Sequence, residues 1–136
     1  MSRFLENALG FGSALDIDDF DKAATFLHHN CAYDIGSGIL IGPKAICGSY
    51  ESNMKSGRAE LDELIWGKCE AKTIDENKIE LYFTDYLVHK GIKHTHQCKQ
   101  ILTFEEEGKI IAIKHINLPG EPEKLLAFYS SVGLRD

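Results

Sequence analysis

The spacing of apolar residues changes along the chain from a helical period to a strand-like one. In the first 29 residues, apolar positions recur three and four apart, with a break at Gly10 and Gly12. This pattern predicts two successive helices, and Asp16 is well suited to be the N-cap of the second. A third helix is expected from Pro43, since proline suits the first helical position, with Gly57 beyond its end.

Most of the remaining sequence alternates as strands do. Residues 31–41 predict two short strands joined by a glycine turn, and Glu121-Pro122 begins a last helix. Lys90-Gly91 and Glu107-Gly108 suit tight hairpin turns between longer strands. Those longer strands are expected at 62–74, 78–89, 92–104 and 109–118. The order of elements predicts one α+β domain over residues 1–136, with helices on one face of a curved antiparallel sheet.

Two-residue turns assign each strand position one partner on the next strand. The expected partners are Leu81–Gln100, Phe83–Cys98, Asp85–His96, Leu87–His94, Cys98–Asn117, Gln100–His115, Leu102–Ile113 and Phe104–Ile111. One face of the four strands then carries no lysine, whereas the other carries Lys93, Lys99 and Lys114. Because lysine ammonium groups are rarely buried, the lysine-free face is expected to point inward.

The inward face is unusually polar for a protein core. It includes Asp85, His94, His96, Gln100, His115 and Asn117. A buried polar group without a partner costs about 1–3 kcal/mol, so these groups either bind one another or line a cavity. In the first case we expect cross-strand hydrogen bonds from Asp85 to His96 and from Gln100 to His115. We favour the second, a pocket for a small molecule.

Three segments carry a resemblance to a known family: residues 26–34, the stretch Gly42-Pro43-Lys44-Ala45-Ile46, and residues 104–110. With their spacing and the order of helices, the chain resembles the nuclear-transport-factor-2-like fold in its SnoaL-like and ketosteroid-isomerase-like branch, over nearly its whole length. The resemblance implies a cystatin-like cone, in which a curved antiparallel sheet wraps around helices and encloses a pocket. It also implies a homodimer.

The same resemblance implies roles for individual residues. Asp34 falls where the isomerases hold their general-base aspartate, Gln100 where they keep a protonated aspartic acid as oxyanion donor, and Tyr50 at a supporting helix tyrosine. The tyrosine that these enzymes carry in their first helix has no counterpart here. A second branch, similar to scytalone dehydratase, has a His-x-His at the place of His94-Thr95-His96 and eliminates water from a hydroxylated ring.

We therefore expect a cofactor-independent isomerase, dehydratase or cyclase that acts on a small, largely apolar carbonyl or hydroxyl compound. Asp34 would be the base, and Asp85 would hold His96 as a proton shuttle. His115, Gln100 and Asn117 would orient the substrate as hydrogen-bond donors, and Tyr50, Phe83 and Cys98 would contact it. The alternative is a non-catalytic ligand-binding or dimerisation module. A metal on His94 and His96 is a less favoured reading, and no metal or cofactor is expected.

Charge and composition limit the kinds of molecule that the protein is expected to bind. The 136 residues carry 15 Lys and Arg against 21 Asp and Glu, a net charge of −6, which leaves no basic surface for nucleic acid. No apolar run is long enough to span a membrane, and Glu6 and Asn7 interrupt the stretch that a signal peptide would need. We therefore expect a cytoplasmic protein.

Two further groups of residues complete the expectations. The four cysteines, Cys31, Cys47, Cys69 and Cys98, show no Cys-x-x-Cys spacing, so we expect free thiols, most of them in the core. The outer face of the sheet carries apolar side chains between its lysines, namely Tyr82, Tyr86, Val88, Ile101 and Ile116. Such a face usually finds a partner, which favours a homodimer through it.

Overall fold

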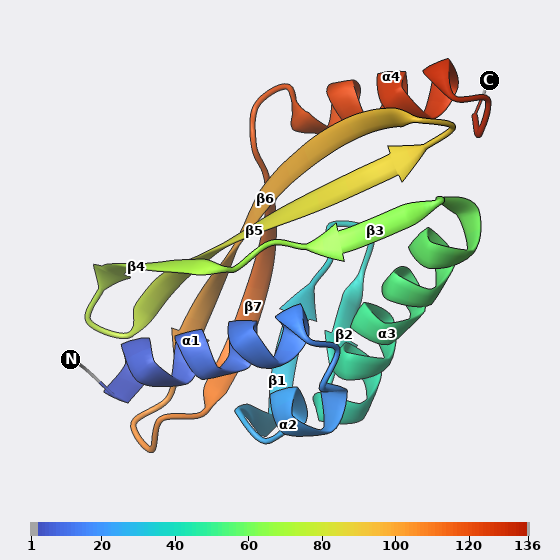
Figure 1. Cartoon of the computed structure of the whole chain (residues 1–136). Coiled ribbons are helices and arrows are strands. Elements are labelled where there is room, and N and C mark those ends of the chain that lie inside the picture. Colours follow the sequence, from blue (N-terminus) through green and yellow to red (C-terminus); the bar gives the residue numbers. More distant parts are fainter. Residues whose placement is uncertain (1–2, 136) are drawn as a thin grey trace.

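Seven strands form one curved, open sheet that helices cover (Figure 1). The computed structural model describes residues 3–135. The helices are α1 (Arg3–Asp16), α2 (Phe20–Ala24), α3 (Pro43–Glu60) and α4 (Glu121–Ser131). The strands are β1 (Leu27–Asp34), β2 (Ile39–Ile41), β3 (Glu63–Trp66), β4 (Glu70–Asp75), β5 (Lys78–His89), β6 (Ile92–Phe104) and β7 (Ile110–Asn117). This arrangement confirms the predicted α+β class.

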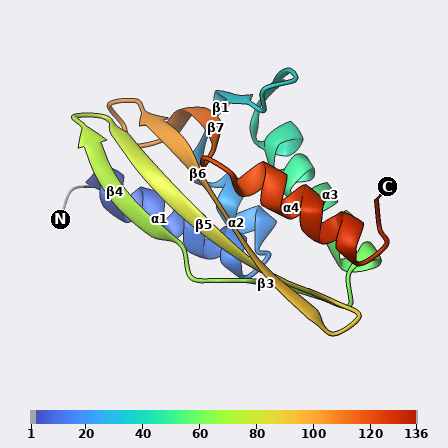
Figure 2. The same ribbon diagram turned by 90° about the horizontal axis from the view of Figure 1, so that it is seen from above.

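The sheet runs in the order β2-β1-β7-β6-β5-β3, and β4 also pairs with β5. Strands β1 and β7 pair in parallel, while β5 pairs antiparallel with β3, β4 and β6. Helices α1 and α2 lie near one end of the long strands and α4 near the other, where it packs on β6 (Figures 1 and 2). The curved strands β5 and β6 thus connect two separate helical layers.

Each helical layer buries its own hydrophobic cluster. The larger cluster joins α1 to the sheet and contains Phe11, Leu81, Leu102 and Phe104 among its members. The smaller cluster lies under α4 and consists of Leu61, Leu87, Phe128 and Val132. Because these clusters are distinct, the inner face of the sheet has an unfilled stretch between them.

Glycines in α1 and α3 mark close contacts rather than helix ends. Helix α1 continues through Gly12, where an added Cβ would lie 2.5 Å from the Sγ of Cys69. Helix α3 likewise continues through Gly57, where a Cβ would lie 2.5 Å from a methyl of Leu64. The predicted breaks at these glycines were wrong, because tertiary packing rather than local propensity explains them.

Other predicted boundaries also shift. Asp19, not Asp16, is the N-cap of α2, since its carboxylate accepts from the Lys22 amide at 3.1 Å. Strand β1 begins at Leu27, inside the segment predicted as helix. The strand predicted over 62–74 is divided into β3 and β4, and the Gly67 amide in the gap donates to the Thr84 carbonyl at 2.8 Å.

The predicted register of β5 and β6 is confirmed at every pair, including Asp85 opposite His96. Between β6 and β7 the pairs from Cys98–Asn117 to Leu102–Ile113 are also confirmed. At the turn, however, Phe104 pairs with Ile110 and not with Ile111, because the loop spans more than two residues: the Glu105 amide donates to the Lys109 carbonyl. Ile110 is consequently the fully buried residue of the two.

The remaining expectations concern the cysteines and the outer face. Cys31, Cys47, Cys69 and Cys98 are free and buried, as predicted. On the outer face the Lys99 ammonium binds the Glu80 carboxylate at 2.6 Å, and Tyr86 is 46% exposed. A homodimer through this face stays a prediction. Within residues 3–135, no helix has both the length and the apolarity to cross a membrane, and the cytoplasmic location also stays a prediction.

Candidate functional site

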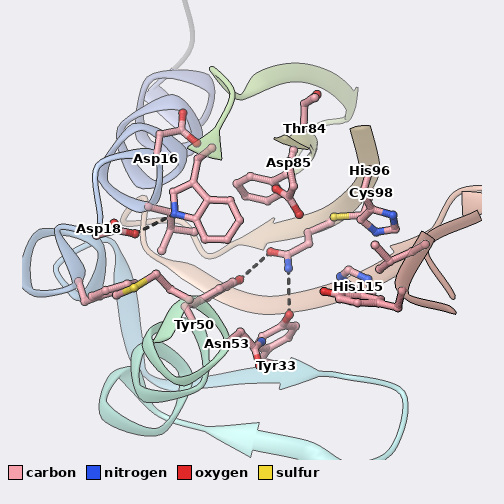
Figure 3. Close-up of a pocket in the computed structure, with 18 residues that line it drawn as sticks. Asp16, Asp18, Tyr33, Tyr50, Asn53, Thr84, Asp85, His96, Cys98 and His115 are labelled. Atoms are coloured by element: carbon pink, nitrogen blue, oxygen red, sulfur yellow. Dashed lines mark hydrogen bonds between the residues drawn. The ribbon is translucent and has the colours of Figure 1, made fainter. Parts of the chain in front are cut away.

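A cavity of about 440 Å³ lies between the two hydrophobic clusters, on the inner face of the sheet (Figure 3). Leu15 and Tyr33 of the larger cluster line it, together with Leu125 and Tyr129, which pack against the smaller cluster. Its apolar and aromatic walls are Leu15, Phe20, Tyr33, Tyr50, Met54, Trp66, Phe83, Leu125 and Tyr129. Its polar walls are Asp16, Asp18, Asn53, Thr84, Asp85, His96, Cys98, Gln100 and His115. This combination of apolar walls with a few polar groups is typical of small-molecule sites.

Seven of the nine residues predicted for the site line this cavity: Tyr50, Phe83, Asp85, His96, Cys98, Gln100 and His115. Asp34 does not line it. Its carboxylate accepts a hydrogen bond from the Gly36 amide at 2.9 Å, within the turn that follows β1. Tyr33 faces the cavity, and because adjacent strand residues point to opposite faces, Asp34 points away from it. The predicted position of Asp34 at the cavity is therefore wrong.

Asn117 also lies outside the cavity lining. It is exposed at the end of β7, where its Oδ1 is 3.1 Å from the Nε2 of His115. His115 itself lines the cavity. Asn117 can therefore orient the His115 imidazole, but its own amide does not reach the lining.

Asp85 has the most unusual environment of the acidic residues in the cavity. Its carboxylate points into the cavity (Figure 3), and no residue within 3–135 donates a hydrogen bond to it. Burial, and secondarily the nearby Asp16 carboxylate, raises the pKa of Asp85 to about 7. A carboxyl group with such a pKa can both accept and return a proton near neutral pH.

A chain of hydrogen bonds crosses one wall of the cavity. The Tyr50 hydroxyl donates to the Gln100 Oε1 at 2.6 Å, and the Gln100 Nε2 donates to the Tyr33 hydroxyl at 2.9 Å (Figure 3). The two tyrosine rings stack with centroids 5.4 Å apart. Because the Tyr33 oxygen accepts from Gln100, its own proton remains for a ligand. Burial raises the pKa of Tyr33, so the hydroxyl keeps that proton at neutral pH.

This chain takes the place of the Gln100–His115 hydrogen bond, which belonged to the less favoured alternative of a self-satisfied inner face. The two residues are cross-strand partners, but the Gln100 amide reaches the tyrosines of β1 and α3 instead. Gln100 is only 3% exposed, so its polar atoms need these partners. Both ends of its amide are therefore committed to the two tyrosines.

His96 lies opposite Asp85, but its ring is directed toward helix α4. The Nδ1 of His96 lies 4.0 Å from the Glu121 carboxylate and has no hydrogen-bond partner among the described residues. Burial, partly opposed by the Glu121 charge, lowers the pKa of His96, which leaves its imidazole neutral at neutral pH. No hydrogen bond joins Asp85 to His96 within residues 3–135, so the predicted pair exists in register only.

Cys98 lines the cavity, whereas His94 lies outside it. Burial, with smaller contributions from Asp85 and Glu121, raises the pKa of Cys98 to about 12, so its thiol stays protonated and serves as a wall. His94 does not line the cavity; its ring stacks on Phe128 with centroids 5.2 Å apart. Across the described chain, no group of three or more His, Cys, Asp or Glu side chains is arranged to hold a metal.

The fold itself is shared with solved structures. A candidate polyketide cyclase from Xanthomonas campestris pv. campestris matches with a TM-score of 0.68 at 14% identity, over 92% of this chain and 95% of its own. TerC, crystallised together with polyporic acid, matches at 0.69 and 13%, over 97% and 99%. An NTF2-like protein of unknown function from Cytophaga hutchinsonii matches at 0.63 and 16%, over 90% and 94%. No protein-family model and no curated protein matches the sequence.

The chain has the nuclear-transport-factor-2-like fold. This confirms the fold predicted from the sequence, at identities where the similarity concerns architecture and not activity. Within this nuclear-transport-factor-2-like domain, the cavity lies on the inner face of the sheet, where the lysine-free side of the strands was predicted to point.

Sequence reasoning missed several residues of the site. Tyr33 had a usable signal in the sequence, because it lies two residues after Cys31 on a predicted strand and so shares its face. Both residues are buried in the structure. Asp16 and Asp18 had no such signal: they follow the last apolar turn of α1, and only the tertiary fold brings them beside β3 and β5. Asp18 accepts from the Trp66 indole at 2.8 Å and from Arg58 at 2.6 Å, which fixes Trp66 as a cavity wall.

Proposed function

We propose that this domain is a cofactor-independent acid–base enzyme, an isomerase, dehydratase or cyclase, that acts on a small, largely apolar compound with a carbonyl or hydroxyl group. The observation that carries the proposal is the Asp85 carboxyl group: it faces a cavity of about 440 Å³, lacks a hydrogen-bond donor within residues 3–135, and has a pKa of about 7. Candidate polyketide cyclases among the proteins of similar fold support the reaction class.

The proposed chemistry begins with proton transfer from carbon. The Asp85 carboxylate takes a proton from the carbon next to a substrate carbonyl, and the bonding electrons move into an enolate. The Tyr33 hydroxyl, which faces the cavity with its proton uncommitted, donates to the enolate oxygen. Asp85 then returns its proton to a neighbouring carbon, which completes an isomerisation, or to a departing hydroxyl, which leaves as water.

His96 would take part as a neutral imidazole. Because its pKa is lowered, the ring carries no charge at neutral pH, and one ring nitrogen can accept a proton. The Glu121 carboxylate, 4.0 Å from its Nδ1, would stabilise the imidazolium that forms. In this assignment His96 takes a proton from a substrate hydroxyl, holds it as an imidazolium and returns it, and His115, next to Asn117, helps to orient the substrate oxygen.

The direct test is hydrogen–deuterium exchange at the carbon next to the carbonyl, followed by NMR in deuterated water with a panel of small aryl ketones. We expect the unmodified protein to catalyse exchange and Asp85→Asn to reduce the rate by about 10²–10⁴-fold while ketone binding is retained. Asp34→Asn decides between the two aspartates, since its carboxylate lies outside the cavity. Loss of exchange in Asp34→Asn, but not in Asp85→Asn, would contradict the proposal.

The second candidate function is a non-catalytic ligand-binding module of the same fold. It is supported by the Tyr50–Gln100–Tyr33 chain, which presents the Tyr33 hydroxyl to a ligand without requiring any proton transfer. The same experiment separates the two, because a binding module would bind the ketones without any exchange above that of the buffer.

A further inference from the structure

The charged groups that line the cavity are of one sign. Three carboxylates, Asp16, Asp18 and Asp85, face it, whereas neither lysine nor arginine is among its lining residues. Asp18 is neutralised, since Arg58 lies 2.6 Å from its Oδ2 and the Trp66 indole donates to its Oδ1. The carboxylates of Asp16 and Asp85 therefore have no Lys or Arg side chain beside them in the lining of the cavity.

Asp16 is held in place without a cation. Its Oδ2 accepts from the Cys69 amide at 2.9 Å, which fixes the carboxylate at the end of α1. Burial, and secondarily the charge of Asp16, raises the pKa of the Cys69 thiol, so this neighbour stays neutral and protonated. No ion pair to Asp16 occurs among the described residues. A partly buried carboxylate of this kind attracts an incoming cation more than a fully solvated one does.

The walls around these carboxylates are suited to an organic cation. Six aromatic side chains line the cavity: Phe20, Tyr33, Tyr50, Trp66, Phe83 and Tyr129. Aromatic rings present a negative face that attracts ammonium groups, and the attraction increases when the site is shielded from water. A carboxylate combined with aromatic walls recognises a protonated amine on an apolar body, whereas an anionic compound would meet only like charge.

We propose that the ligand of this cavity is an aromatic or aliphatic amine, whose ammonium group pairs with Asp16 while its apolar body lies between the aromatic walls. The inference rests on the proposed function and deepens it: the substrate would be an amino-substituted carbonyl or hydroxyl compound. Asp16 supplies the counter-charge, and Asp85 remains free for proton transfer. In Figure 3, Asp16 lies on the side of the cavity away from His96 and His115, which leaves room for the reacting end of the molecule.

The test uses three probes of matched shape and different charge: 1-naphthylmethylamine, 1-naphthalenemethanol and 1-naphthoate. Their binding to the unmodified protein is measured by isothermal titration calorimetry at about pH 8, where the amine remains protonated. We expect the amine to bind about tenfold or more tightly than the alcohol, and the carboxylate to bind more weakly than either. Equal binding of amine and alcohol, or tighter binding of the carboxylate, would overturn the inference without any variant.

Two variants assign the preference to Asp16. Asp16→Asn keeps an oxygen that can accept from the Cys69 amide but removes the charge, so we expect the amine to lose its advantage while the affinity of the alcohol is unchanged. Glu63→Gln removes the same charge from an exposed position on β3 outside the cavity and should leave the preference intact. An amine preference that survives in Asp16→Asn would contradict the role of Asp16.

The outcome for this inference is separable from that for the proposed function. Amine-selective binding without proton exchange on any amino ketone would support the ligand class and reject the enzyme. Exchange on neutral ketones without any preference for the amine would support the enzyme and reject the ligand class.

Discussion

Gln100 shows how one buried side chain joins three elements of the fold. The residue is 3% exposed, and its amide bonds the hydroxyls of Tyr33 on β1 and Tyr50 on α3. In Gln100→Leu both hydrogen bonds are lost, and the two tyrosine hydroxyls lose the amide that joins them. We expect the free energy of unfolding to fall by about 2–4 kcal/mol, measured by urea denaturation.

The control for this substitution is Gln97→Leu on the same strand. The Gln97 side chain is exposed and makes one long contact, 3.3 Å, to the Thr84 hydroxyl. Its removal should change stability by less than about 0.5 kcal/mol. Equal losses in the two variants would show that the Tyr50–Gln100–Tyr33 chain does not stabilise the fold.

The residues of the site differ in how far the sequence could predict them. Asp85, His96 and Gln100 were found because long strands with a tight turn between them determine which residues share a face. Asp34 was misplaced because the resemblance gave a role without a side-chain direction. The hydrophobic pattern could not predict Asp16 as a cavity residue, since its position there depends on where the whole of α1 packs.

At the scale of elements, helix α1 depends on a close approach to the sheet at Gly12. In Gly12→Ala the new Cβ would lie 2.5 Å from the Cys69 Sγ and 3.1 Å from both terminal methyls of Leu81. Since both neighbours are buried, we expect a loss of about 1–3 kcal/mol in the free energy of unfolding. The measurement is again urea denaturation.

Gly48→Ala in α3 is the matched substitution with the opposite expected sign. Gly48 is exposed inside the helix, and an added Cβ would meet nothing within 4 Å. Alanine has the higher helix propensity, so we expect a gain of about 0.5–1 kcal/mol. If both alanines stabilise, the contact between α1 and Cys69 is looser than the structure shows.

These glycines also explain which element boundaries the sequence predicted poorly. A glycine reads locally as a helix break, yet Gly12 and Gly57 lie inside helices because a neighbouring side chain occupies the space of a Cβ. The β5–β6 hairpin, in contrast, was predicted to the residue, since its alternation is long and Lys90-Gly91 suits a tight turn. Boundaries that depend on distant packing, such as the gap between β3 and β4, have no comparable local signal.

At the scale of the whole molecule, the cavity separates two hydrophobic clusters that would otherwise merge. Helix α4 is attached to the rest through the smaller cluster, the stacking of Phe128 on His94, and the pair of Arg135 with Glu60 at 2.8 Å. A domain that leaves a polar hollow inside gives up apolar burial that a filled core would provide. Its stability should therefore respond to the charge state of the groups in that hollow.

Asp85 gives this response a definite sign. Its pKa is raised in the folded protein, from 3.8 to about 7, so between these values the folded state binds a proton that the unfolded state has released. The contribution of Asp85 to stability is thus favourable at low pH and is lost as pH rises toward 7, by an amount on the order of 2–4 kcal/mol. Asparagine at this position is neutral throughout. We expect Asp85→Asn to be more stable than the unmodified protein at pH 8 by roughly that amount.

The same comparison at about pH 3 should show a much smaller difference, since Asp85 is then largely protonated in both the folded and the unfolded state. Taking the difference between the two proteins at each pH removes the titration of His96, which affects both alike. Urea denaturation at a series of pH values measures it. A stability difference that does not grow with pH would mean that Asp85 is not the buried acid of this cavity. A variant that is more stable but has lost proton-exchange activity would show that the Asp85 carboxylate serves function at a cost in stability.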